Sequence, residues 1–149
     1  MRAKDFLKQL PKLNKMIENK MAEKEQWKSV AMCSTSFNTS ERVQSTPNPQ
    51  KMSDAIVRCL DIEAEIDQCI DALVDTKKDV ISVIEQLEAT EYDVLHKVYV
   101  QNITLDIVAD KYDKSYSWAT TIHGQALKNV QKILDERESE NGNQERTNA

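Results

Sequence analysis

The chain has 149 residues with a net charge of −5, and 30% of them are Asp, Glu, Lys or Arg. With only two Gly and three Pro, the composition favours long, solvated helices. No apolar run approaches the roughly 18–20 residues that cross a bilayer, and the three cysteines form no CxxC pair. We therefore expect an all-α intracellular protein with no membrane contact, metal or cofactor.

The first 28 residues predict a basic amphipathic helix. From Phe6 to Ile17, apolar residues step by 4, 3 and 4, which places them on one helical face. Pro11 predicts that the regular helix begins there and runs to about Lys28. Eight basic and four acidic residues give this segment a charge of +4.

A segment near 34–51 is rich in Ser, Thr, Asn and Pro and predicts a flexible linker. From Ser53 to about Leu87 we expect a long helix, because ten of eleven positions at heptad spacing are apolar or cysteine. These positions are Met52, Ala55, Cys59, Ile62, Ile66, Cys69, Leu73, Thr76, Val80, Val83 and Leu87.

This spacing is typical of a coiled coil, either between chains or as an antiparallel hairpin with the N-terminal helix. Residues 51–90 carry a charge of −6, with four basic and ten acidic residues, which favours the hairpin. A purely structural role, a dimerisation arm and a docking surface all remain open for this helix.

Residues 89–135 predict a separate helix-turn-helix domain that follows a helical arm of residues 1–88. Thr90 is expected to cap a helix to about Gln101, and Thr104 the next one. Asp113 and Lys114 would form the turn, with Ser115 capping the final helix. The tail, residues 136–149, is expected to be disordered.

The second helix of a helix-turn-helix enters the DNA major groove, and its first turns face the bases. Polar side chains there can read base edges, and nearby lysines can bind phosphates. The candidate DNA-binding residues are Thr104, Lys114, Tyr116, Ser117, Thr120, Thr121, Gln125 and Lys128. His96 and His123 lie in no metal motif and no nucleophile–base pair is evident, so no catalytic residue is assigned and no enzyme is expected.

The same stretch resembles the region of bacterial sigma factors that reads the promoter −35 element. The matching residues are Thr104-Leu105-Asp106, Val108-Ala109, Tyr112-Asp113, Ser115, Ile122, Ala126-Leu127 and Val130. Over nearly all of residues 1–135, the chain is similar to short sigma-like proteins encoded by phages and prophages of Gram-positive bacteria. This resemblance implies a late-gene transcription regulator in the bacterial cytoplasm, with double-stranded DNA and RNA polymerase as partners and a homodimer as a further expectation.

The chain departs from the sigma-factor pattern by lacking arginines in the second helix, where Tyr116, Trp118 and Thr120 stand instead. Phosphate attraction should therefore be weak, and binding is expected to need dimerisation, polymerase or the basic N-terminal helix. Two alternative functions remain: a small terminase-type DNA-packaging protein, and a polymerase-binding protein that does not bind DNA.

Overall fold

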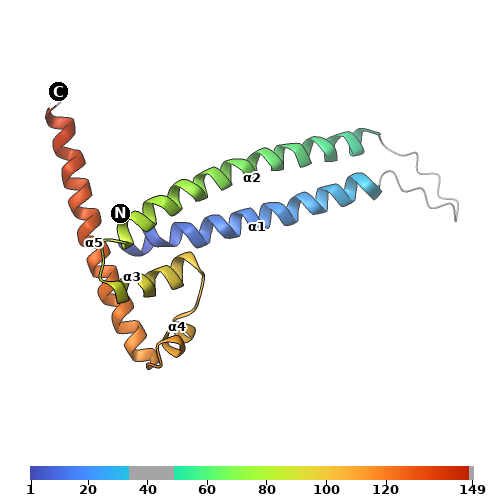
Figure 1. Ribbon diagram of the computed structural model, residues 1–149. Helices are drawn as coiled ribbons and strands as arrows, with labels where there is room; N and C mark the ends of the chain where they lie inside the picture. Colours follow the sequence, from blue (N-terminus) through green and yellow to red (C-terminus); the bar gives the residue numbers. More distant parts are fainter. Residues whose placement is uncertain (34–48, 148–149) are drawn as a thin grey trace. The chain divides into compact units, whose positions relative to one another are not determined.

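A computed structural model describes residues 1–33 and 49–147 of the chain. Their elements are α1 (Ala3–Cys33), α2 (Pro49–Ile84), α3 (Ala89–Leu95), a π-helical segment η1 (His96–Val100), α4 (Leu105–Lys111) and α5 (Tyr116–Thr147) (Figure 1). These ranges contain no strand, which confirms the predicted all-α class. Most of the predicted linker, residues 34–48, lies outside the described residues.

The helix α1 begins at Ala3, so the prediction that it starts at Pro11 is wrong. A proline inside a helix costs about 3 kcal/mol. Phe6, Leu7 and Leu10, which precede Pro11, are at most 5% exposed. Burial of each such side chain contributes about 1.5–3 kcal/mol, so the buried turn outweighs the cost of the proline.

The chain divides into two compact units, and both long helices contribute to each of them. The first unit comprises Met1–Lys12 and Leu73–Ala149, and the second comprises Leu13–Ala72. The division therefore differs from the predicted boundary between residues 88 and 89. The reason is that the start of α1 and the end of α2 share one buried core with the C-terminal helices.

The core of the first unit is mainly aliphatic and draws on five helical elements. It combines the start of α1 with the end of α2, and adds side chains from α3, η1 and α5. Its buried members are Ala3, Phe6, Leu7, Leu10, Val80, Val83, Ile84, Leu95, Tyr99, Ala126, Val130 and Leu134. This core fixes where α5 lies relative to the first three turns of α1.

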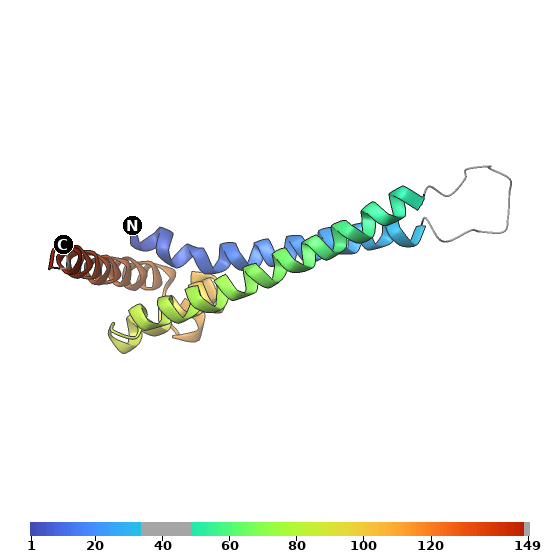
Figure 2. The same ribbon diagram turned by 90° about the horizontal axis from the view of Figure 1, so that it is seen from above.

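In the second unit, α1 and α2 lie side by side and run antiparallel (Figures 1 and 2). Ion pairs join them, with nitrogen–oxygen distances of 2.7 Å for Lys20–Glu65 and 2.5 Å for Lys24–Glu63. All eleven predicted heptad positions are buried or half-buried, and ten of them lie in α2, which ends at Ile84 rather than near Leu87. In the structure, α2 thus lies against α1 of the same chain.

Helix α5 continues to Thr147, whereas the sequence predicts a disordered tail from residue 136. Arg137 anchors this extension, because its guanidinium lies 2.9 Å from the Asp79 carboxylate and donates to Ser82 at 3.1 Å. Glu, Gln and Arg, which favour helix, alternate here with Ser, Asn and Gly, which do not. None of the helices described carries an apolar stretch long enough to cross a membrane.

Candidate nucleic-acid interface

A tight turn with fixed backbone geometry joins α4 to α5. The N–H of Lys114 donates to the carbonyl of Ala109 at 3.0 Å, and the N–H of Asp113 donates to that of Asp110 at 3.1 Å. Asp113 has a φ of 52°, the left-handed conformation that closes this C-terminal motif. Asp adopts that conformation more readily than most residues. The turn therefore forms where the sequence predicts it.

Of the three predicted caps, Thr90 is wrong, because it lies inside α3, whose N-cap is Glu88. The other two caps behave differently from each other. The Ser115 hydroxyl oxygen accepts the N–H of Trp118 at 3.2 Å, which confirms the predicted cap of α5. Thr104 occupies the capping position of α4 with an extended backbone, but its side chain makes no capping bond. The Thr104 side chain is exposed, and its hydroxyl is not committed to the helix that it precedes.

Tyr112, in the turn, connects three elements of the first unit. Its hydroxyl donates to the Asp93 carboxylate on α3, which also accepts from the Lys97 ammonium in η1. The Tyr112 ring lies 5.1 Å from the Trp118 ring, measured between centroids. The Lys97 nitrogen lies 5.9 Å from the centroid of the Tyr112 ring. This side chain therefore holds the turn against α3 and against the first turn of α5.

Electrostatics keep this cluster in one protonation state around neutral pH. Burial alone would raise the pKa of Asp93, but hydrogen bonds from Lys97 and Tyr112 outweigh it and lower that pKa. Burial and the hydrogen bond to Asp93 raise the pKa of Tyr112 to about 12. The carboxylate is thus ionised and the phenol neutral, which is the pairing that their hydrogen bond needs.

All eight candidate DNA-binding residues are exposed. Thr104 lies at the start of α4 and Lys114 in the turn, while the other six lie along the first four turns of α5. The face of α5 that contains Ala119, Ala126 and Val130 is buried, so the polar side chains point away from the core. The structure therefore brings the candidates of α5 together on one exposed side.

Two of these side chains already use their hydroxyl protons within the helix. Thr120 and Thr121 both donate to the Ser117 carbonyl, at 2.8 and 2.9 Å. Their oxygens keep lone pairs that can accept from a base amino group, and their methyl groups can contact thymine. Gln125 and the half-exposed Tyr116 add amide and phenol groups. The surface can thus present both donors and acceptors.

The charge on the exposed side of α4 and the turn is balanced rather than basic. Lys111 and Lys114 are exposed there, but so are Asp106, Asp110 and Asp113. On α4, Ile107 also exposes 48% of its surface. Because phosphate contacts supply much of the affinity of DNA-binding proteins, this surface alone should attract DNA weakly.

Behind the exposed side, polar pairs that sequence reasoning missed hold α5 in place. Asn129 donates to both oxygens of the buried Glu91 carboxylate, at 3.1 and 2.9 Å. The Tyr99 hydroxyl shares a hydrogen bond with Nε2 of His123 at 3.0 Å. Burial, followed by the charge of Lys4, lowers the pKa of His123. An acidic residue in a first helical turn looks solvent-exposed by sequence, so no local signal marks Glu91 as buried.

Among the residues described, no three His, Cys, Asp or Glu side chains gather as metal ligands would. Cys59 and Cys69 are free thiols, half-buried along the α1–α2 pair. Comparison with known proteins finds no matching family, no similar curated protein and no similar solved structure.

Proposed function

We propose that this protein binds double-stranded DNA sequence-specifically through the exposed side of α5 and so regulates transcription. The observation that carries the proposal is the α4–turn–α5 unit. Its second helix is capped by Ser115 and presents uncharged hydrogen-bonding side chains over its first turns. A short helix, a tight turn and a second helix with an exposed polar start form the arrangement that enters the major groove.

The biological setting in this proposal comes from the resemblance to sigma-like phage regulators. We place the protein in the cytoplasm of a bacterial host, where it would activate phage late genes together with RNA polymerase. The balanced charge of the α4–α5 surface supports a role for RNA polymerase in DNA binding. Because this surface attracts phosphates weakly, part of the affinity for DNA has to come from a partner or from another part of the protein.

A selection from a random duplex library tests sequence-specific binding. The wild-type chain should enrich a defined motif, and the Thr120→Ala, Thr121→Ala, Gln125→Ala variant should lose at least tenfold in affinity for it. Each good base contact is worth about 1–3 kcal/mol of discrimination. The matched control replaces three exposed uncharged residues further along α5, Ser139, Asn141 and Gln144, with Ala. Equal loss in both variants, or no enriched motif, contradicts the proposal.

A homodimer formed through the second unit is part of the proposal. Large apolar side chains are exposed along α1 and α2, including Met21 (54%), Ile56 (43%), Leu60 (60%) and Ile70 (41%). Contiguous exposed apolar surface marks interaction sites in soluble proteins, and a dimer could engage two DNA half-sites. Sedimentation equilibrium should show a dimer that Leu60→Ser and Ile70→Ser together weaken. A ring-shaped oligomer would instead favour the packaging protein.

One observation favours the alternative of a protein-binding module that does not contact DNA. Exposed Ile107 sits among the carboxylates Asp106 and Asp110 on α4, a surface that suits a protein partner better than a phosphate backbone. Purified RNA polymerase bound equally by the wild type and by the Thr120→Ala, Thr121→Ala, Gln125→Ala variant, together with no DNA enrichment, would support this alternative.

A further inference from the structure

The first three turns of α1 present a stripe of basic side chains. Lys4, Lys8 and Lys12 are spaced by four residues, so they share one face of the helix, and all three are exposed, as is Arg2. Asp5 is the only acidic residue in this segment. The opposite face, with Phe6, Leu7 and Leu10, is buried.

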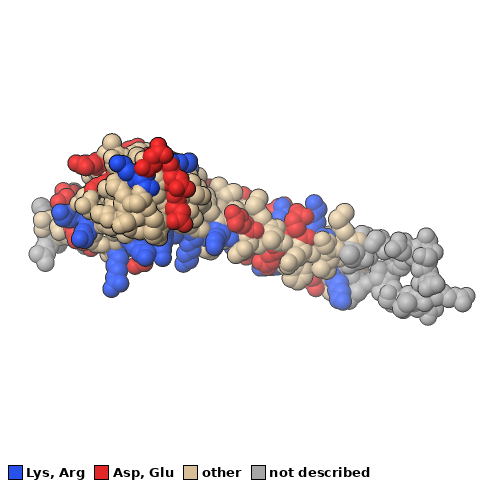
Figure 3. Space-filling view, turned by 90° about the horizontal axis from the view of Figure 1, so that it is seen from below, with Lys and Arg blue, Asp and Glu red and all other residues tan. Residues whose placement is uncertain are grey.

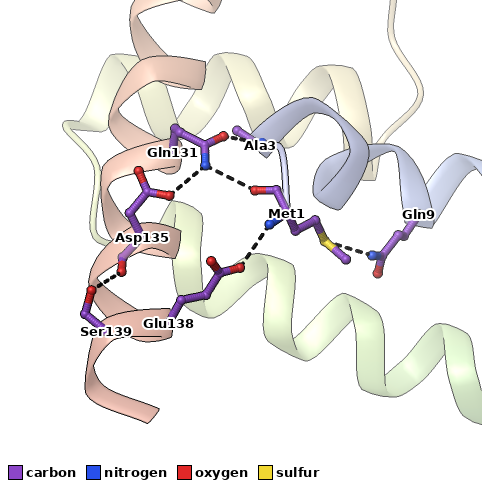
Figure 4. A network of polar contacts seen from close by, with 7 residues as sticks. All are labelled: Met1, Ala3, Gln9, Gln131, Asp135, Glu138 and Ser139. Carbon is purple, nitrogen blue, oxygen red and sulfur yellow. Dashed lines mark hydrogen bonds and ion pairs between the residues drawn. The ribbon is translucent and has the colours of Figure 1, made fainter. Parts of the chain in front are cut away.

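The packing of this segment places the stripe beside α5. The Ala3 N–H donates to Oε1 of Gln131 at 2.7 Å, and Nε2 of Gln131 donates to the Met1 carbonyl at 3.1 Å (Figure 4). The Met1 amino group pairs with Glu138 at 2.9 Å. All of these residues belong to the first compact unit, so the position of the stripe relative to α5 is defined.

The stripe begins beside α5 at Gln131 and Glu138, which follow the candidate DNA-binding residues along that helix. The positive charge of Lys4 acts on His123, which lies on α5 between Thr121 and Gln125. Lysines at positions 8 and 12 continue the same face of α1 from that point. Basic charge therefore extends away from the α5 surface along a second helix.

These cations are available to an external anion. Within the described part of the chain, no ion pair involves Arg2, Lys4, Lys8 or Lys12. By contrast, Lys20, Lys24 and Arg58 of the second unit pair with glutamates. In the space-filling view of Figure 3, Lys and Arg side chains project from the face shown and are interspersed with Asp and Glu side chains. Arg2, Lys4, Lys8 and Lys12 thus carry charges that no carboxylate of the described residues neutralises, whereas Lys20 and Lys24 further along α1 are neutralised by glutamates.

We infer that Arg2, Lys4, Lys8 and Lys12 form a binding stripe for the phosphate backbone of duplex DNA, next to the base-reading side of α5. The inference rests on the proposed function, and it explains how α5, which has no arginine in its first turns, could hold DNA. Each neutralised phosphate releases condensed counterions, so such a stripe adds affinity without sequence preference. The stripe is not a membrane anchor, because the apolar face it would need to insert is already buried in the core.

The test compares two variants that each lose three positive charges. The stripe variant is Lys4→Gln, Lys8→Gln, Lys12→Gln, and the control is Lys51→Gln, Lys77→Gln, Lys78→Gln, whose lysines are exposed on α2. Fluorescence anisotropy measures binding to the selected duplex and to an unrelated duplex across a salt series, and circular dichroism checks that both variants fold.

The stripe variant should bind both duplexes more weakly by a similar factor, so that the ratio of the two affinities is unchanged. The slope of log K against log salt should become shallower by about 2–3 in the stripe variant and by less than 1 in the control, since each phosphate contact contributes about 0.9. If the wild type binds DNA but the stripe variant keeps its affinity and slope, the stripe is refuted while the proposed function stands.

Two further outcomes would refute the inference. If the wild type binds no duplex, the proposed function fails and the stripe fails with it. Loss of binding to phosphatidylglycerol vesicles in the stripe variant, with DNA binding unaffected, would overturn the inference in favour of a membrane surface.

Discussion

Replacing Tyr112 with Phe removes one hydroxyl from the turn between α4 and α5 and leaves the ring in place. The lost group donates to the Asp93 carboxylate, which keeps its second donor, Lys97. Hydrogen bonds to charged groups contribute about 1.5–3 kcal/mol. Because Asp93 is one-third exposed and keeps one partner, we expect the lower part of that range, about 1.5–2 kcal/mol of lost unfolding free energy.

The pH dependence gives this prediction a specific signature. The pKa of Asp93 is lowered in the folded protein, so its contribution is present above its unfolded pKa and is lost as the pH falls through the folded value. The pKa of Tyr112 is raised to about 12, so its contribution is complete below about 10 and is lost towards 12. The difference between wild type and Tyr112→Phe should therefore shrink at both acidic and strongly alkaline pH.

Urea unfolding monitored by circular dichroism across the pH range measures that difference, and absorbance at alkaline pH follows tyrosine ionisation. One of the four tyrosines should ionise near pH 12 in the wild type, and this component should disappear in Tyr112→Phe. Tyr116→Phe is the control, because Tyr116 is 55% exposed. Equal stability of wild type and Tyr112→Phe at neutral pH would refute the role assigned to this hydroxyl.

Substitutions at three further positions probe the supports of α5. Asp113→Val should destabilise the protein by about 1 kcal/mol or more, whereas Asp113→Gly should not, because the φ of 52° suits Gly and penalises a β-branched residue; equal unfolding midpoints would argue against the closed turn. Glu91→Ala should cost about 1–3 kcal/mol by leaving Asn129 without its acceptors, and an unchanged midpoint in urea would contradict that pairing. The lowered pKa of His123 means that its contribution is present above its unfolded pKa and is lost as the pH falls through the folded value; His123→Gln should flatten this loss, and an NMR titration of His123 at or above its ordinary pKa would count against its burial.

The parts of the fold that follow from local periodicity were predictable. The heptad pattern of α2 identified its seam, and the cap at Ser115 and the turn at Asp113 follow from residue chemistry. The start of α1 was not predictable, because Pro11 is a local signal for a helix boundary and the burial that overrides it comes from distant residues.

The surroundings of the candidate site depend on contacts between distant segments, which a single sequence does not reveal. Ala3 meets Gln131, and Glu91 meets Asn129, across 128 and 38 residues. The sequence indicated an excess of positive charge in the first 28 residues, but it did not indicate which of these charges are paired with carboxylates. Only the structure distinguishes Lys20 and Lys24, which are paired with glutamates, from the lysines beside α5.

DNA reading by α5 is tested most directly by titrating the selected duplex into isotope-labelled protein and following backbone amide chemical shifts by NMR. The largest changes should fall on Tyr116 to Gln125, with smaller ones on Lys4 to Lys12. Changes confined to the second unit, Leu13–Ala72, or to the exposed side of α4 around Ile107, would contradict the claim that α5 reads DNA.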